Sequence, residues 1–269
     1  MKRKHQKECT VFFIVAGFVL LLLLTAISAG LLAPHDPNEV NLLIAELPPG
    51  GSYPLGTDAL GRCMLSRILY GARSSLFASL FITLTVFLIG VTMGVISGYF
   101  GGPLDVVLNK FITVMQSFPK IIMVMALTGI LGIGFGSIIV SLCLVEWVDY
   151  ARISRSYTLS LRERYFIKAA RICGESHLRI IFRRVIPNIF YPLIVNASLG
   201  ISGVIMSISA LSYLGLGVKE PMVEWGMMIS SGRAYIQSNP SMILLPGAAI
   251  FIASSLFNLL GEKLRSQHR

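Results

Sequence analysis

Long apolar runs alternate with short polar segments along the whole chain. Five runs without a charged residue are longer than 20 residues, which is about the length that an α-helix needs to cross a bilayer. The region 106–155 is long enough for two crossings, with the glycine-rich sequence GILGIGFGS at 129–137 as the turn between them. The pattern predicts an all-α integral membrane protein with six transmembrane helices. We expect these at about residues 11–32, 76–99, 107–131, 137–156, 188–211 and 241–261.

The first apolar run follows the basic sequence MKRKHQK, as in a secretory signal peptide, and the sequence AISAG near its end resembles a cleavage site. The apolar region of a signal peptide is only about 7–15 residues long. Because the run here is clearly longer, the pattern favours an uncleaved first helix over a cleaved leader.

Composition supports a membrane protein. Of the 269 residues, 54% are hydrophobic and 13% are charged, and the mean hydropathy is +0.74, whereas about 25% of the residues in a soluble domain are charged. The net charge of +10 would suit either a nucleic-acid ligand or the basic loops on the cytoplasmic side of a membrane.

The positions of the basic residues decide between these alternatives. Nine arginines and lysines lie between residues 152 and 184, whereas five lie in the longer segments 33–75 and 212–240. Basic residues concentrate on the cytoplasmic side of membrane proteins. The sequence therefore predicts that both termini and residues 157–187 are cytoplasmic (N-in, C-in), and it gives no support for a nucleic-acid partner.

The basic segment Tyr165–Pro187 reads as two short helices at an angle. Gly174 interrupts the first helix, and Pro187 is expected to end the second because an interior proline costs about 3 kcal/mol. The second helix has an apolar face that we expect to pack on the protein, formed by Leu178, Ile181, Phe182 and Val185.

Small residues mark the end of the first helix. Ala169, Ala170 and Gly174 would form an outward-facing patch that lets another backbone approach closely. A basic interfacial helix resting on anionic lipid is the alternative, but it would not need such a patch. The pattern favours a protein-docking surface.

The sequence KAARICG, with Pro187 thirteen residues after Gly174, resembles the EAA loop of ABC-importer permeases. The resemblance implies that Lys168, Ala169, Ala170, Gly174 and Pro187 belong to the segment that docks on a cytoplasmic ATPase. Lys168 stands where the family usually has an acid, so a contact made by that acid is not expected here.

Two further stretches resemble the dipeptide, oligopeptide and nickel branch of these permeases: residues 54–76 before the second span, and residues 211–236 after the fifth. In the first of them, Cys63 occupies a position that is commonly acidic in that branch. The closing sequence FNLLGEKLRSQHR is similar to the last span of the same branch, so the resemblance covers nearly the whole chain.

The resemblance implies the type I ABC-importer permease fold and a location in the bacterial inner membrane. Its expected divisions are 1–75 (tail, first helix and external loop), 76–262 (five-helix core with the EAA loop at 157–187) and 263–269 (cytoplasmic tail). It implies a second, homologous permease subunit, two ATP-binding subunits and an extracytoplasmic substrate-binding protein as partners, in addition to membrane lipid. ATP and magnesium would bind to the ATPases, so this chain would hold no cofactor and would not be an enzyme.

The substrate would be nickel, free or chelated, or small peptides, with a slight preference for nickel because little sequence precedes the first helix. The alternative function is a secondary, ion-coupled transporter. That class often contains inverted repeats, and no repeat is evident here.

An external loop before the second span carries the sequence LGTDALGR. An ordinary turn with an aspartate cap is one interpretation. The resemblance instead implies that Gly56, Thr57, Asp58 and Gly61 meet the substrate-delivering protein or the external gate. In the loop after the fifth span, Trp225 and Tyr235 are typical of aromatic residues at a membrane interface.

Two charged residues fall within predicted spans. A charge at mid-membrane costs about 2.5–3.5 kcal/mol or more, so it usually faces a partner or a wet cavity. We expect Lys120 and Glu146 to pair near the translocation path, unless Lys120 reaches an interface instead. Asp149 could pair with Arg152, three residues further on.

The sequence contains no metal or catalytic motif. The four cysteines and four histidines are scattered, and neither HExxH nor GxxxxGK[ST] occurs. The methionines of the sequence GMM at 226–228 are more typical of packing than of metal binding. We therefore expect neither a metal site nor catalytic residues.

Overall fold

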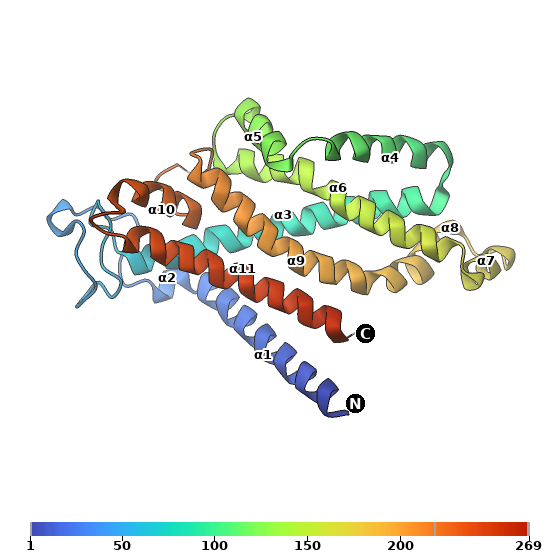
Figure 1. Ribbon diagram of the computed structural model, residues 1–269, viewed down its shortest axis with the longest axis horizontal. Helices are drawn as coiled ribbons and strands as arrows, with labels where there is room; N and C mark the ends of the chain where they lie inside the picture. Colours follow the sequence, from blue (N-terminus) through green and yellow to red (C-terminus); the bar gives the residue numbers. More distant parts are fainter. Residues whose placement is uncertain (1, 218, 268–269) are drawn as a thin grey trace.

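A computed structural model describes residues 2–217 and 219–267, and within these residues the chain forms helices and no β-strand (Figure 1). The long helices are α1 (Lys2–Ile27), α3 (Met64–Phe100), α6 (Phe135–Arg162), α9 (Ile186–Tyr213) and α11 (Ser241–Gln267). The shorter ones are α2 (Ala29–Leu32), η1 (Leu42–Ile44), α4 (Gly102–Gln116), α5 (Lys120–Leu131), α7 (Tyr165–Ile172), α8 (His177–Ile180), the π-helix η2 (Ile181–Val185), α10 (Trp225–Gly232) and η3 (Arg233–Tyr235).

Most of the predicted spans coincide with observed helices. The glycine-rich turn lies between α5 and α6, where Gly132 adopts a φ of 91°. Four segments of the described chain are long and apolar enough to cross a bilayer, and the bent pair α4–α5 would make a fifth. α6 is also long, but it contains the charges Glu146 and Asp149. The count of six spans therefore stays a prediction.

The third span is not the single helix that we predicted for 107–131. α4 ends at Gln116, α5 begins at Lys120, and their axes differ by 89°. Pro119 lies at this break and has no amide hydrogen to donate to a continuing helix, and a proline also disfavours helical backbone in the residue before it.

The prediction that Pro187 ends a helix is wrong. The helical segment continues from His177 to Tyr213, with Pro187 in the first turn of α9. The π-helix η2 lies directly before this turn and changes the hydrogen-bond register there. Proline is tolerated in the first turn of an α-helix, so the chain passes through Pro187 without a stop.

Glycines allow α3 and α6 to pack closely. Gly90, Gly94 and Gly98 repeat every four residues along α3 and face α6. A Cβ atom on Gly94 would lie 2.2 Å from the carbonyl oxygen of Ala151, far inside van der Waals contact. This small-residue stripe is the kind of surface by which membrane helices associate.

The remaining long helices lie beside α3 and enclose an apolar core. Buried side chains of α1, α3, α9, α10 and α11 form one cluster that includes Leu76, Ile205, Trp225 and Phe257. A second cluster joins α3 to α5, α6 and α9. The predicted interfacial position of Trp225 is wrong, because its indole is buried in the first cluster and donates to the carbonyl oxygen of Ile68.

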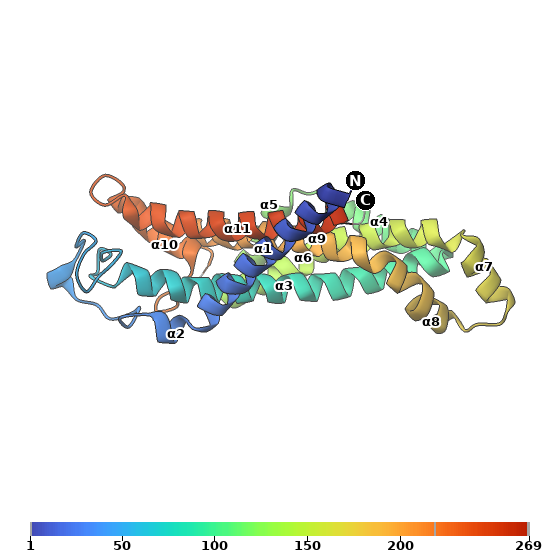
Figure 2. The ribbon, with the colours of Figure 1, turned by 90° about the horizontal axis from the view of Figure 1, so that it is seen from below.

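Loops gather at two opposite ends of the helix bundle (Figure 2). The end formed by residues 33–63, α10 and the loops around it is called the α10 end. The end that carries α7 and α8 is called the α7 end. The C-terminal part of α11 and the N-terminal part of α1 point toward the α7 end (Figure 1), as the predicted N-in, C-in orientation requires.

Candidate functional site

The turn between α7 and α8 is built around Gly174. Its φ is 76°, a left-handed conformation that favours glycine. The amide of Glu175 donates to the carbonyl oxygen of Ala170, and the amide of Gly174 donates to that of Arg171, a helix-ending arrangement related to the Schellman motif. Gly174 is therefore required for the shape of the turn, whether or not a partner docks on it.

The predicted small-residue patch is only partly exposed. Ala169 and Gly174 face solvent, but Ala170 is only 3% exposed and belongs to a core cluster with Ile167, Ile180 and Val185. Ala170 is therefore part of the internal packing and is not accessible to a docked partner.

The predicted anchoring face of the second helix is half wrong. Ile181 and Val185 are buried, but Leu178 and Phe182 are 68% and 66% exposed. The π-helix repeats after about five residues rather than four, so Ile180 and Val185 share the inner face. Large apolar side chains remain exposed on both helices of this segment: Tyr165 and Ile172 on α7, Leu178 on α8 and Phe182 on η2.

Ion pairs brace residues 165–185, which are predicted to dock on the ATPase and are called the docking segment below. Arg184 makes a two-pronged pair with Glu175, with N–O distances of 2.7 and 2.8 Å, and this bond holds the pKa of Glu175 below its usual value. Lys168, the base in place of the usual acid, lies 3.0 Å from Glu163 and lowers the pKa of that carboxyl. Lys168 therefore has a partner within its own chain.

Tyr99 joins the end of α3 to the docking segment. It is buried, its hydroxyl lies 3.0 Å from Nδ1 of His177, and the guanidinium of Arg171 lies 4.7 Å from its ring centroid. One side chain of α3 thus contacts both α7 and α8.

A second polar cluster lies at the α4–α5 break. Lys120 Nζ is 3.3 Å from Glu146 Oε2 and also contacts Asp149. Gln116 donates to Asp149 at 3.1 Å and accepts from Arg152 at 2.9 Å. Asp149 therefore pairs with Lys120 instead of Arg152. Residues of this cluster line a cavity of about 250 Å³.

The external-loop motif is folded by its glycines and Thr57. Gly56 and Gly61 have φ values of 76° and 74°, and a Cβ atom on either would overlap backbone of the preceding loop. The hydroxyl of Thr57 accepts from the amide of Leu47 and donates to the carbonyl oxygen of Ile44. These contacts fold residues 41–63 onto themselves and leave Asp58 buried.

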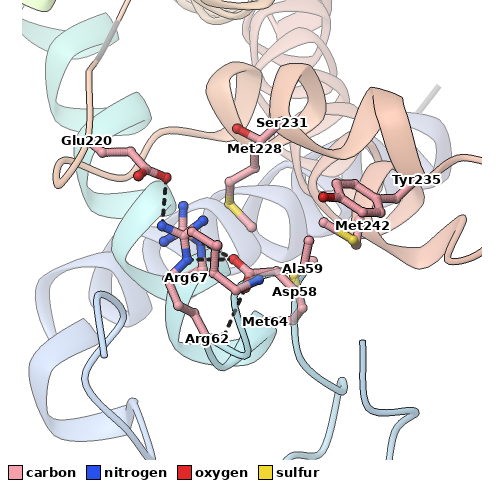
Figure 3. Close-up of a pocket in the computed structure, with 11 residues that line it drawn as sticks. Asp58, Ala59, Arg62, Met64, Arg67, Glu220, Met228, Ser231, Tyr235 and Met242 are labelled. Atoms are coloured by element: carbon pink, nitrogen blue, oxygen red, sulfur yellow. Dashed lines mark hydrogen bonds and ion pairs between the residues drawn. The ribbon is translucent and has the colours of Figure 1, made fainter. Parts of the chain in front are cut away.

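Asp58 is the centre of an ionic network at the α10 end (Figure 3). Its carboxylate accepts from Arg62 Nε at 2.7 Å and lies 3.4 Å from Arg67 Nε. Arg62 also binds Glu220 at 2.6 Å, and Arg67 donates to the carbonyl oxygen of Pro37.

Glu224 was not among the predicted site residues. It is fully buried at the start of α10, where its carboxylate accepts from the amides of Gly226 and Met227 and from the hydroxyl of Ser75. An acid at a helix start is a recognised cap, so the sequence EWGMM offered a signal. No pattern in the sequence indicated that its partner on α3 would be Ser75, 149 residues away.

Comparisons with known proteins now identify the class. Residues 90–265 match the family described as the inner membrane component of binding-protein-dependent transport systems. The chain is a member of this family. It is a permease subunit of an ABC importer located in the inner membrane, rather than a secondary transporter or an enzyme.

The permease has relatives with different names. It is 36% identical to the dipeptide transport system permease DppC of Alkalihalophilus pseudofirmus, over 98% of this chain and 85% of that protein. It is 35% identical to the nickel transport system permease NikC of Escherichia coli K12 (92% and 89%), and 36% identical to the glutathione transport system permease GsiD of Pectobacterium atrosepticum (94% and 84%). These similarities confirm the predicted dipeptide and nickel branch.

The fold of the permease also matches a solved transporter. A chain from inward-facing conformations of the MetNI methionine ABC transporter superposes with a TM-score of 0.64 at 20% identity, covering 77% of the permease and 98% of that chain. The predicted type I importer fold is thereby confirmed. As a subunit of a binding-protein-dependent importer, the permease works with ATPase and substrate-binding partners.

Proposed function

We propose that the permease forms one half of a translocation path for small peptides or for nickel, free or chelated. The other half would be a second, homologous permease subunit, and two ATP-binding subunits would hold ATP and magnesium. Support comes from the named relatives, which include dipeptide and nickel permeases, and from the polar cluster of Lys120, Glu146 and Asp149, whose charges suit a wet path.

We propose that the docking segment, residues 165–185, binds one ATPase. The observation that carries this proposal is the exposure of large apolar side chains on this segment, since Tyr165 and Ile172 are 90% and 86% exposed. The inner side of the segment is buried and is held by the ion pair of Arg184 and Glu175. Large apolar side chains left exposed in this way are typical of an interaction site. Because α7 ends in a fixed turn at Gly174, the face is presented as a rigid unit.

The test uses Ala169→Trp, because Gly174 cannot be replaced without backbone strain. Ala169 is exposed on α7, so tryptophan would block close approach without entering the core. We expect the permease, co-expressed with its ATPase and extracted in detergent, to lose at least about tenfold of the retained ATPase, since one obstructed contact of 1.4 kcal/mol suffices for a tenfold change.

The matched control is Ala234→Trp, the same change at an exposed position of the α10 end. It should leave ATPase retention unchanged. Equal retention by Ala169→Trp and the unaltered permease would exclude docking at this face.

A further inference from the structure

The ionic network at the α10 end borders a cavity of about 250 Å³. Its charged wall is formed by Asp58, Arg62, Arg67 and Glu220, which we call the arginine cluster (Figure 3). Its apolar wall contains three buried methionines and Tyr235, and the methionines are Met64, Met228 and Met242.

Three members of the cluster are fixed in the interior, but the fourth is not. Asp58, Arg62 and Arg67 are 4%, 6% and 2% exposed. The side chain of Glu220 is 49% exposed, and it reaches Arg62 from a loop 158 residues further along the chain. Glu220 is therefore the member that can leave without unfolding the cluster.

Charge balance explains why a negative group is needed in that place. The two guanidiniums share one internal carboxylate, that of Asp58. A buried charge without a partner is strongly unfavourable, so Arg62 requires a second carboxylate. Any ligand that brings a carboxylate to Arg62 Nη1 can replace Glu220 at no loss of charge pairing.

We propose that this cavity binds the free carboxylate of a small peptide, and that Glu220 occupies the carboxylate position when no peptide is bound. An arginine fork matches the geometry of a carboxylate. The cavity volume lies just below the usual range of about 300–1,000 Å³ for drug-sized ligands, which suits a ligand of dipeptide size. The flexible methionines can adapt to different peptide side chains.

The assignment of the peptide as transported substrate rests on the proposed function, whereas the binding step does not. A site at the α10 end would receive the peptide from the side opposite the docking segment. Selection at this site would depend on the carboxylate and only weakly on the side chain.

The test is isothermal titration of the full-length permease in lipid nanodiscs, without ATPase. The probes are N-acetyl-alanyl-methionine and its C-terminal amide, which lacks the carboxylate. We expect the acid to bind at least about tenfold more tightly than the amide, since the amide cannot make the charge-assisted bond to Arg62.

Two variants separate ligand binding from loop stability. Glu220→Gln removes the internal competitor and should tighten binding of the acid about three- to tenfold. Arg62→Gln should abolish the difference between acid and amide. The control is Glu39→Gln, a change of an exposed acid outside the cluster, in the loop 33–63 that also carries Arg62. It should have no effect.

Equal binding of acid and amide would overturn the proposal, as would unchanged or weaker acid binding by Glu220→Gln. Because Glu220 is peripheral, its variant decides the matter even if Arg62→Gln does not fold. If the unaltered permease does not retain the ATPase, the proposed function is refuted. The result of the peptide titration would not be affected.

Discussion

Replacing Gly94 with alanine adds a single methyl group at the closest approach of α3 and α6. The new Cβ atom would lie 2.0 Å from the Ser154 hydroxyl and 2.2 Å from the Ala151 carbonyl oxygen. The hydroxyl can rotate away, but the carbonyl belongs to the α6 backbone. To restore an ordinary contact of 3.4 Å, the two helices would have to separate locally by about 1.2 Å.

The magnitude follows from two opposing contributions. Overpacking of this kind costs about 1–3 kcal/mol, and the upper part of that range applies because no side-chain rotation relieves the backbone overlap. Alanine in a helix is favoured over glycine by about 1 kcal/mol. We therefore expect Gly94→Ala to lower the free energy of unfolding by about 2 kcal/mol.

The control is Gly203→Ala on α9. Gly203 lies inside a helix, and a Cβ atom there would meet nothing within 4 Å. Only the gain in helix propensity remains, so this variant should be stabilised by about 1 kcal/mol. The same chemical change is thus expected to have opposite signs at the two positions.

The assay is thermal unfolding in detergent, followed by tryptophan fluorescence. One kcal/mol corresponds to a shift of roughly 2–4 °C for a chain of this size. Gly90→Ala should also destabilise the protein, because its Cβ atom would lie 2.4 Å from the carbonyl oxygen of Trp147. Gly98→Ala should destabilise it less, because its Cβ atom would lie 2.9 Å from the carbonyl oxygen of Arg155. If Gly94→Ala and Gly203→Ala shift the midpoint equally, the close-packing argument is refuted.

Two further predictions concern the docking segment. Tyr99→Phe removes the hydroxyl that is hydrogen-bonded to His177, a bond worth about 0.5–1.5 kcal/mol. Because this bond joins α3 to the docking segment, we expect the variant in proteoliposomes to hydrolyse more ATP per substrate transported, while its retention of the ATPase is unchanged. Tyr157→Phe is the control, and an unaltered ratio in Tyr99→Phe would exclude coupling through this bond. Arg184 lowers the pKa of Glu175 in the folded protein. The stabilising effect of this ion pair is therefore present above the pKa that Glu175 has in the unfolded chain, and it is lost as the pH falls through the pKa of Glu175 in the folded protein. Spin labels across the turn should report loosening over that acidic window, and Glu175→Gln should remove the pH dependence; the same transition in both proteins would contradict the assignment.

The sequence was sufficient for the features that depend on local composition. Apolar length located the long helices, and the glycines at 129–137 located the turn before α6. The stripe at Gly90, Gly94 and Gly98 has an equally local signal, a glycine at every fourth residue of an apolar run.

The failures have a common physical cause: they depend on backbone register or on distant partners. The π-helix shifts the inner face of the second helix, so Ile180 and Val185 are both buried and Phe182 is exposed against the regular helical pattern. Ala170 is buried because it packs in a cluster with Tyr99, Ile180 and Val185, which lie on other elements. The partner of Arg62 is Glu220, 158 residues away, and no periodicity links them. The pair Lys120–Glu146 could be predicted from the sequence, because a charged residue within the membrane by itself requires a partner.

α3 links the arginine cluster at the α10 end to the docking segment at the α7 end. α3 contributes Arg67 to the arginine cluster, Ser75 to the bonds of Glu224, the glycine stripe to α6, and Tyr99 to the docking segment. Its 37 residues extend over about 55 Å. Because the C-terminal third of α3, next to the docking segment, is closely packed on α6 at Gly90, Gly94 and Gly98, loose side chains cannot absorb a displacement of the docking segment there. We infer that such a displacement moves α3 as a rigid body, and that it then changes the position of Arg67 relative to Glu220 on its separate loop at the other end.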